Sequence, residues 1–172
     1  MKPKTTINVN KGTVEIRSEV IIESSQEEVW NAISIPGEIE KFHPLIKKSK
    51  TESTLFSGNG SRRLCELLPM GKMIETVTDW KNGSGYTSLV IGGAMLPPYE
   101  FMSGTIALHE FNEKTVANFS FSYKLKYGVI GRFLDKTMIR PQFKKAPPKY
   151  VLGLKYYVEN GRKISSEELK RY

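Results

Sequence analysis

The sequence predicts an α+β protein in which a curved antiparallel sheet of about seven strands wraps around a long C-terminal helix, with two short helices after the first strand. Two observations indicate this class. Six segments of strand character follow one another between residues 46 and 126, linked by short turns, as in an antiparallel meander. Beyond them, apolar residues recur at three- and four-residue spacing, as on one face of a helix.

We expect the 172 residues to form a single domain with a substantial core. Residues 1–12 are polar and basic and are predicted to be a flexible tail, and residues 162–172 a C-terminal tail. Residues 13–23 alternate apolar and polar side chains, which is the period of a half-buried strand.

A capping-box pattern predicts the first helix. Ser25 is followed three residues later by Glu28, and an apolar face follows them. This helix ends before Pro36, and a second short helix over residues 38–42 ends before Pro44.

The meander is predicted from short strands separated by clusters of Gly, Asn, Ser and Pro. Its strands are expected over residues 46–55, 62–68, 73–80, 86–91, 100–111 and 115–126. The loop of residues 92–99 has unusual apolar content for an exposed turn. It is either a flexible lip over a ligand or a wide hairpin turn that packs on a neighbour.

The helical pattern runs through residues 128–161 and has an apolar side and a basic side. The apolar positions of its first half are Ile130, Phe133, Leu134, Thr137 and Met138, and the pattern returns at Tyr150, Val151, Leu154, Tyr157 and Val158. The basic side carries Arg132, Lys136 and Arg140.

Prolines divide this stretch. Pro141 removes a helical hydrogen bond, and Pro147 suits the first turn of a new helix. We predict two segments, over residues 129–140 and 147–160, with Gly161 as the terminal cap. Ile139 and Phe143 fall off the predicted apolar face, and we expect a pocket to open at the break.

Composition narrows the cellular context. The single Cys65 excludes an internal disulfide and suits a reducing compartment, so a cytoplasmic protein is expected. No apolar run is long enough to span a bilayer. The formal charge of +8 is spread along the chain, which favours solvated surface over nucleic-acid binding.

An ordered set of segments resembles a known superfamily. The segments are SSQEEVWNAI (24–33), FHP (42–44), GSRRL (60–64), GKMIETVTD (71–79), GYT (85–87), LPPY (96–99) and SGTI (103–106). Together they are similar to the START-like (SRPBCC) superfamily, within it to the polyketide cyclase/dehydrase and lipid-transport branch. Two departures are Phe42 and His43 at a position where the family often has Trp, and the prolines that interrupt the family's single helix.

The resemblance implies a Bet v 1-like helix-grip fold that encloses a mostly apolar ligand cavity. Strand alternation and helical spacing select most of the predicted wall of this cavity. Its residues are Leu89, Ile91, Met95, Leu96, Ile106, Leu108, Phe119, Phe121, Tyr123, Phe133, Leu134, Met138, Tyr150 and Leu154. Met95 and Leu96 are included because their loop resembles the Leu-Pro gate loop of plant hormone receptors in this superfamily. Aromatic stripes also form plain filled cores, and that alternative stays open for each of these residues.

Few residues suggest chemistry. Possible polar contacts are His43, Glu75 and Tyr123, whose hydroxyl would anchor a ligand. His109 is interpreted as a surface residue and Cys65 as a buried structural thiol. The two histidines, without HExxH or an Asp-rich loop, predict no metal site, and no cofactor is expected.

Three functional hypotheses follow. The first is non-covalent carriage or sensing of a small hydrophobic ligand such as a lipid, sterol or polyketide. The second is a small cyclase- or dehydrase-type enzyme, which a converging Arg, His or carboxylate in the cavity would favour. The third is weak contact with an anionic membrane through the basic residues Arg132, Lys136, Arg140, Lys144, Lys145 and Lys149. The oligomeric state is left open.

Overall fold

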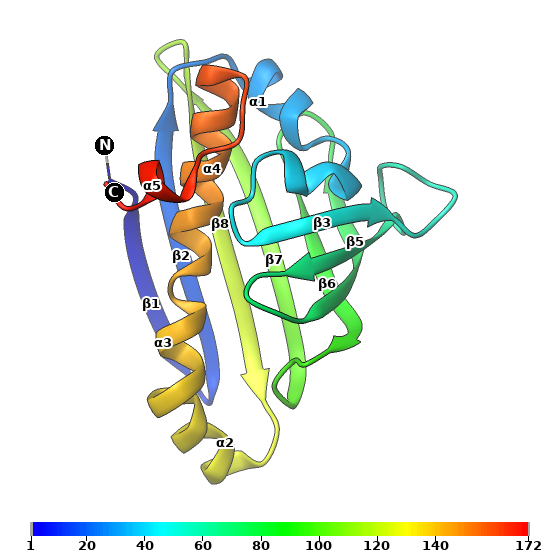
Figure 1. The fold of residues 1–172 in the computed structure, drawn as a ribbon, viewed down its shortest axis with the longest axis vertical. Coiled ribbons are helices and arrows are strands. Elements are labelled where there is room, and N and C mark those ends of the chain that lie inside the picture. Colours follow the sequence, from blue (N-terminus) through cyan, green and yellow to red (C-terminus); the bar gives the residue numbers. More distant parts are fainter. Residues whose placement is uncertain (1, 172) are drawn as a thin grey trace.

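The computed structural model describes residues 2–171, which form one antiparallel sheet curled around the C-terminal helices (Figure 1). The strand order is β1-β2-β8-β7-β6-β5-β4-β3. The strands are β1 (Lys4–Asn10), β2 (Thr13–Ile22), β3 (Ile46–Thr51), β4 (Arg62–Leu67), β5 (Lys72–Lys81), β6 (Gly85–Ala94), β7 (Tyr99–Phe111) and β8 (Lys114–Leu125). The predicted α+β helix-grip class is confirmed, with eight strands instead of about seven.

The additional strand is β1, which lies inside the stretch predicted to be a tail. It pairs with β2 from Lys4 opposite Glu19 to Asn10 opposite Thr13. All its residues are exposed, so the backbone ladder holds it rather than burial of its side chains. With Ile7 and Val9 as its only large apolar residues, its sequence carries little strand signal.

The C-terminal stretch after Gly161 is also ordered. Helix α5 (Ser166–Leu169) begins with a capping box between Ser165 and Glu168. Arg162 pairs with Glu168 at 2.7 Å, which ties the segment to its own start. Met1 and Tyr172, which belong to the predicted tails, lie outside the described residues.

The two short helices follow β2. In α1 (Gln26–Ile33) both hydrogen bonds of the Ser25–Glu28 capping box are present. The second is the 3-10 helix η1 (Pro36–Lys41), which starts earlier than predicted because Pro36 is accommodated in its first turn.

The C-terminal helix is interrupted as the prolines predict. Its parts are α2 (Gly128–Leu134), the π-helical turn η2 (Asp135–Ile139), α3 (Arg140–Phe143) and α4 (Ala146–Asn160). Gly161 caps α4 in the left-handed conformation, with φ of 70°. The first part continues to Phe143, beyond the predicted end, because Pro141 lies in the first turn of α3.

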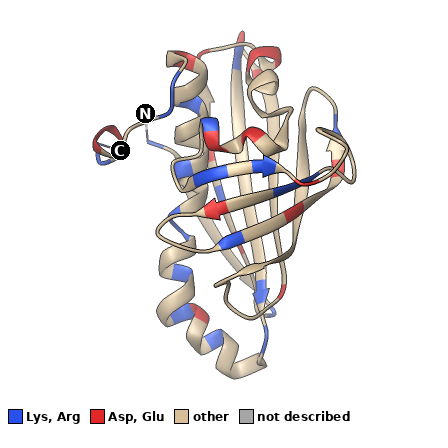
Figure 2. Cartoon of the chain, turned by 45° about the vertical axis from the view of Figure 1, so that its right-hand side comes forward, with Lys and Arg blue, Asp and Glu red and all other residues tan. Residues whose placement is uncertain are grey.

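The sheet has two unlike edges. β1 forms one edge, and the short strand β3 forms the other and carries Lys47, Lys48 and Lys50 (Figure 2). Charged, short edge strands discourage pairing with another chain.

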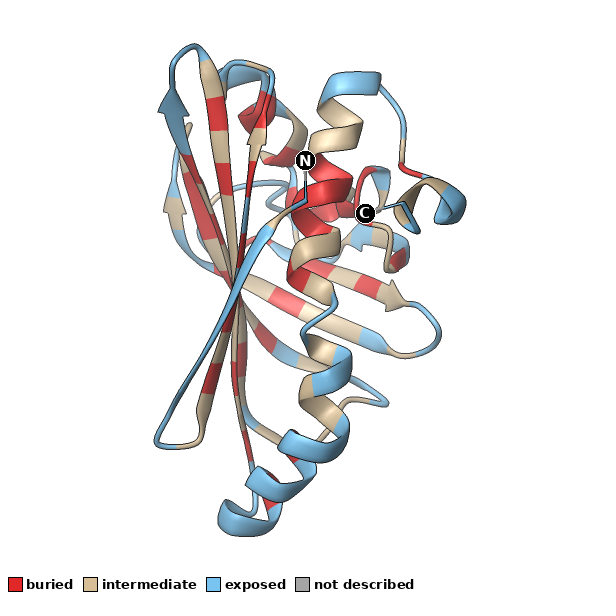
Figure 3. Cartoon of the chain, turned by 90° about the vertical axis from the view of Figure 1, so that its left-hand side faces the viewer, coloured by how far each residue is buried: buried red, intermediate tan, exposed pale blue. Residues whose placement is uncertain are grey.

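The interior is divided into two apolar clusters. The upper cluster packs α1 and the middle of α4 against the sheet, and includes Trp30, Ile106 and Leu154. The lower cluster includes Val14, Met102 and Tyr123. Among the C-terminal helices, Figure 3 shows buried residues mainly on α4, whereas α2 and α3 are mostly exposed. Among residues 2–171, no helix combines the length and apolar composition that crossing a bilayer requires.

Candidate ligand-binding site

The concave face of the sheet is built by every second residue of each strand. On β7 and β8, the predicted wall residues Ile106, Leu108, Phe119, Phe121 and Tyr123 lie on this face and belong to the two clusters. From α4, Tyr150 and Leu154 pack into the upper cluster.

On β6 the predicted face was wrong. Tyr86, Ser88 and Val90 are buried on the concave side, so Leu89 and Ile91 point outward, and Ile91 is 48% exposed. Both alternating sets of this strand contain apolar residues, so the pattern does not distinguish its faces. A shift of one residue moves every side chain to the other face.

The predicted sheet-facing side of the first C-terminal helix was also wrong. Phe133, Leu134 and Met138 are exposed, and Phe133 is 67% exposed. The helix instead buries Gly131 and Asp135 against the sheet. Beyond them, Ile139 and Phe143, which the sequence placed off the apolar face, pack against the lower cluster.

The loop between β6 and β7 divides its two apolar residues. Leu96 packs against the lower cluster. Met95 has a positive φ of 61° and is 71% exposed, so it does not line the interior. The loop thus covers the sheet with one side chain and presents the other to solvent.

A buried ion pair lies on the concave face in the upper half. Arg63 Nε donates to Glu75 Oε2 at 2.7 Å, and a second guanidinium nitrogen donates to the carbonyl of Pro36 at 3.1 Å. Cys65 Sγ lies 3.9 Å from the same carboxylate oxygen. Burial raises the pKa of the Cys65 thiol to about 12, so it stays protonated. The sequence singled out Glu75 but missed Arg63. Alternation from the predicted buried Cys65 places Arg63 on the same face, but a charged side chain is expected at the surface unless its buried partner is known.

His43 and Tyr150 lie close to this pair. Burial, followed by the charges of Arg63, Lys163 and Lys149, lowers the pKa of His43 to about 3, so the imidazole is neutral. Its Nδ1 accepts the backbone N–H of Leu45 at 3.1 Å. The ring contacts Tyr150 edge-on, with centroids 5.3 Å apart. His43 therefore caps its own loop inside the core.

A second cluster of polar side chains, Tyr123, Asp135 and Arg140, lies between β8 and the helix formed by α2, η2 and α3. The Tyr123 hydroxyl donates to Asp135 Oδ1, and Arg140 Nε donates to Asp135 Oδ2 at 2.9 Å. Burial, and then the hydrogen bond to Asp135, raise the pKa of Tyr123, so its phenol keeps its proton. The Tyr123 hydroxyl, which the sequence predicted as a ligand anchor, is thus already hydrogen-bonded to Asp135, and Arg140 holds that carboxylate in place.

Between the two clusters, small and polar residues form a belt across the concave face. It consists of Ser18 on β2, Gly104 on β7, Ser88 on β6 and Glu75 on β5. On each strand the flanking inward residues belong to the upper cluster on one side and to the lower cluster on the other. The Ser88 hydroxyl is buried without a hydrogen-bond partner among the described residues.

The helix break crosses this belt. Phe143, the last residue of α3, packs edge-on against Phe121 with centroids 5.2 Å apart. Tyr150 of α4 stacks on Phe119 at 4.0 Å. Phe119 and Phe121 are successive inward residues of β8, so the non-helical step at Lys144 and Lys145 passes over the boundary between the clusters.

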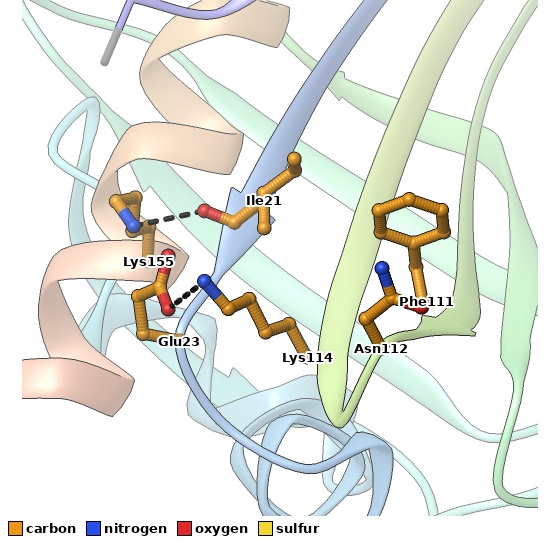
Figure 4. Close-up of a pocket in the computed structure, with 6 residues that line it drawn as sticks. All are labelled: Ile21, Glu23, Phe111, Asn112, Lys114 and Lys155. Atoms are coloured by element: carbon orange, nitrogen blue, oxygen red, sulfur yellow. Dashed lines mark hydrogen bonds and ion pairs between the residues drawn. The ribbon is translucent and has the colours of Figure 1, made fainter.

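Two surface hollows lie outside this interior. One lies between the ends of β2 and β8 and α4, where Lys155 donates to the carbonyl of Ile21 at 2.8 Å and Lys114 pairs with Glu23 at 2.6 Å (Figure 4). The other lies beneath the loop between β6 and β7, beside Lys126. In the first hollow both lysines are already paired with protein groups. Within residues 2–171, no three His, Cys, Asp or Glu side chains gather as they would around a metal ion.

Comparison with known proteins agrees with this architecture. TTHA0849 from Thermus thermophilus has a TM-score of 0.70 and 16% identity, covering 86% of this chain and 98% of its own. Protein XoxI from Bacillus cereus has a TM-score of 0.66 and 16% identity, covering 85% and 96%. Ara h 8.0201 has a TM-score of 0.66 and 14% identity, covering 86% and 99%. At such identities the likeness concerns the fold.

No curated protein sequence matches the chain. The model of the family described as polyketide cyclase / dehydrase and lipid transport matches residues 13–159, from the start of β2 almost to the end of α4. The matched region contains the belt, both polar groups and the broken helix. The chain therefore belongs to the polyketide cyclase/dehydrase and lipid-transport family.

Proposed function

We propose that this protein binds a small hydrophobic ligand, such as a lipid, sterol or polyketide, non-covalently between the belt and the break in its C-terminal helix. It would act as a carrier or a sensor. The family to which the chain belongs supports the ligand class. We place the protein in the cytoplasm, because its only cysteine is unpaired.

The observation that carries the proposal is the Ser88 hydroxyl. Ser88 is 2% exposed, and its oxygen has no partner among the described residues. An unpaired buried hydroxyl costs about 1–3 kcal/mol. A ligand hydroxyl or carbonyl at the belt would recover this cost, while the apolar clusters on both sides would hold the rest of the molecule.

Two measurements test this proposal. Native mass spectrometry of the purified protein should show a co-purified ligand, and a thermal-shift panel of lipids, sterols and polyketides should yield at least one stabilising compound. Ser88→Ala should stabilise the ligand-free protein, since it removes the unpaired hydroxyl, and should weaken binding of that compound by about tenfold. Ser122→Ala, on the outer face of β8, is the matched control and should change neither quantity.

The proposal is abandoned when no compound binds and no ligand co-purifies. Hydrogen exchange tests the entrance separately. The backbone amides of residues 141–148 should exchange faster than those of residues 150–154, and a ligand should slow them. Uniform protection across the break would place the entrance elsewhere.

The buried Arg63–Glu75 pair favours cyclase- or dehydrase-type catalysis as a second candidate. Glu75 belongs to the belt, and the ionised pair beside the phenol of Tyr86 offers groups that polarise a carbonyl or move a proton. Tyr86→Phe keeps the ring and removes the hydroxyl. Under this hypothesis it should reduce turnover of a polyketide substrate while leaving its binding intact. Under simple carriage, the wild-type protein returns the ligand unchanged.

A further inference from the structure

The helix formed by α2 and η2 has its apolar side toward solvent. It buries Gly131 and the carboxylate of Asp135, and exposes Val129, Ile130, Phe133 and Met138. A surface helix normally buries its apolar stripe and exposes its charges. An exposed contiguous apolar patch of this kind marks a contact with another surface.

Asp135 fixes this orientation. Its carboxylate accepts a hydrogen bond from the Tyr123 hydroxyl of β8, which would break if the helix rotated about its axis. Arg140, five residues further along the same helix, holds the other carboxylate oxygen. Arg132 lies along the β1–β2 turn, 3.8 Å from the position that a Cβ would take at Gly12. One flank of the helix is thus basic, and the outward side is apolar.

The charge of the segment is one-sided. Residues 126–149 contain seven Lys and Arg and one acid, the buried Asp135. Figure 2 shows the basic residues spread along this part of the helix. Arg140 pairs with Asp135. Within the described part of the chain, no ion pair within 4.0 Å is formed by five of the other basic residues of this segment: Lys126, Arg132, Lys136, Lys144 and Lys145.

The loop between β6 and β7 extends the patch. The backbone N–H of Lys126 donates to the carbonyl of Pro98 at 3.1 Å, which joins the loop to the start of the helix. Met95, at the exposed tip of this loop, and Tyr127, before α2, are both largely exposed. One end of the molecule therefore presents an apolar tip bordered by lysine and arginine.

We propose that this end docks on an anionic lipid bilayer. The apolar tip, Met95, Tyr127, Val129, Ile130 and Phe133, enters the boundary between headgroups and acyl chains, and the flanking basic residues contact anionic headgroups. A second copy of the chain fits this face poorly, because pairing through it would bring two sets of uncompensated cations together. The inference is independent of the proposed ligand.

Vesicle flotation tests this docking. The ligand-free protein should float with vesicles of phosphatidylcholine and phosphatidylserine at low salt, and much less with phosphatidylcholine alone or at high salt. Ile130→Ser with Phe133→Ser should lower the partition coefficient by at least about tenfold. Arg132→Gln with Lys136→Gln should lower it by about fivefold for each charge removed.

Matched controls exist elsewhere on the surface. Phe56 has the same 67% exposure as Phe133 but lies in the loop before β4, so Phe56→Ser should leave flotation unchanged. Lys47→Gln with Lys48→Gln on β3 removes two exposed cations outside the patch. All variants should keep the wild-type circular dichroism spectrum and melting temperature within a few degrees.

Three outcomes would overturn the inference. These are equal recovery with neutral and anionic vesicles, equal loss in the Phe56 variant and in the Ile130/Phe133 double variant, and a dimer in sedimentation that the double variant dissociates while vesicles capture nothing. Each leaves the ligand-binding test at Ser88 untouched.

Discussion

At the scale of single residues, Arg63 and Glu75 place opposite charges inside the protein. Removing a carboxylate or a guanidinium from water is costly and is recovered only when the partner and further hydrogen bonds are present. Here the Pro36 carbonyl and the Cys65 thiol supply those further contacts. Either charge alone would be buried without compensation.

Glu75→Gln should therefore lower the free energy of unfolding by about 3–5 kcal/mol in urea denaturation. The double variant with Arg63→Met should recover most of this loss, because it removes the stranded cation as well. Glu100→Gln, which breaks the exposed pair with Lys124, should cost less than about 1 kcal/mol. Strict additivity of the Arg63 and Glu75 substitutions would show that the two side chains are not coupled.

His43 makes stability depend on pH. Its folded pKa of about 3 lies below the ordinary 6.5, so the unfolded chain binds a proton that the folded chain refuses. The stability that the neutral His43 contributes to the folded state is fully present above pH 6.5 and is lost as the pH falls toward 3. At pH 5 the loss amounts to about 2 kcal/mol.

Urea denaturation at pH 7.5 and pH 5 measures this loss. His43→Gln should flatten the pH dependence, since the amide does not titrate. His109→Gln, at an exposed position of β7, should retain the wild-type slope. An unchanged slope in the His43 variant would assign the pH dependence to other groups.

At the scale of elements, α4 approaches the loop after η1 because Gly153 has no side chain. A Cβ there would lie 2.3 Å from the carbonyl oxygen of Phe42 and 2.8 Å from Cδ of Pro44. Helix propensity alone would make Gly153→Ala stabilising by about 1 kcal/mol. The clash reverses the sign, and we expect a loss of about 1–3 kcal/mol.

Thermal and urea unfolding of Gly153→Ala decide that sign. Gly92→Ala, where a Cβ would meet nothing within 4 Å, is the control and should be nearly neutral. A stabilised Gly153 variant would mean that α4 moves away from the loop without penalty.

Local patterns predicted the elements better than their faces. The Ser25–Glu28 capping box and the Gly161 cap depend on neighbouring residues, so the sequence indicates them directly. The orientation of α2 depends on the hydrogen bond between Asp135 and Tyr123 of β8. The apolar spacing does not include this long-range contact, so it predicts that the opposite face of the helix is buried. The inward set of β6 is decided in the same way, by partners on other strands.

At the scale of the whole molecule, β1 pairs with β2 and covers the edge that β2 would otherwise expose. Deleting residues 2–11 would leave β2, with its buried Val14 and Ile16, as an unpaired edge. Seven cross-strand pairs at a few tenths of a kcal/mol each suggest a loss of about 2 kcal/mol, or roughly 4–8 °C in melting temperature. The shortened chain should also self-associate in sedimentation experiments.

Ile7→Thr with Val9→Thr keeps the backbone ladder and is the control for this deletion. It should self-associate no more than the wild-type chain and lose little stability. If it behaves like the deletion, the side chains of β1 matter more than its hydrogen bonds.

The architecture was predictable from the order of its elements, whereas the candidate site was only partly so. Phe119, Phe121 and Tyr150 could be named because they stand in clear alternation or helical spacing, and Glu75 because the family that the sequence resembles often has Glu there. The belt could not, because its four residues come from four strands, and only the register of the folded sheet brings them to the boundary between the two clusters, with Ser88 directly opposite Gly104. Ser88 and Gly104 carry no signal in the sequence that separates them from ordinary strand residues.

The buried Cys65 gives the molecule a practical property. Its thiol is shielded and keeps its proton in the native state, so it reacts with alkylating reagents only when the fold opens. The unmodified chain thus reports its own opening rate through the rate of alkylation. A second cysteine, introduced by Phe133→Cys at the exposed tip, would be the only thiol to take a fluorophore under native conditions.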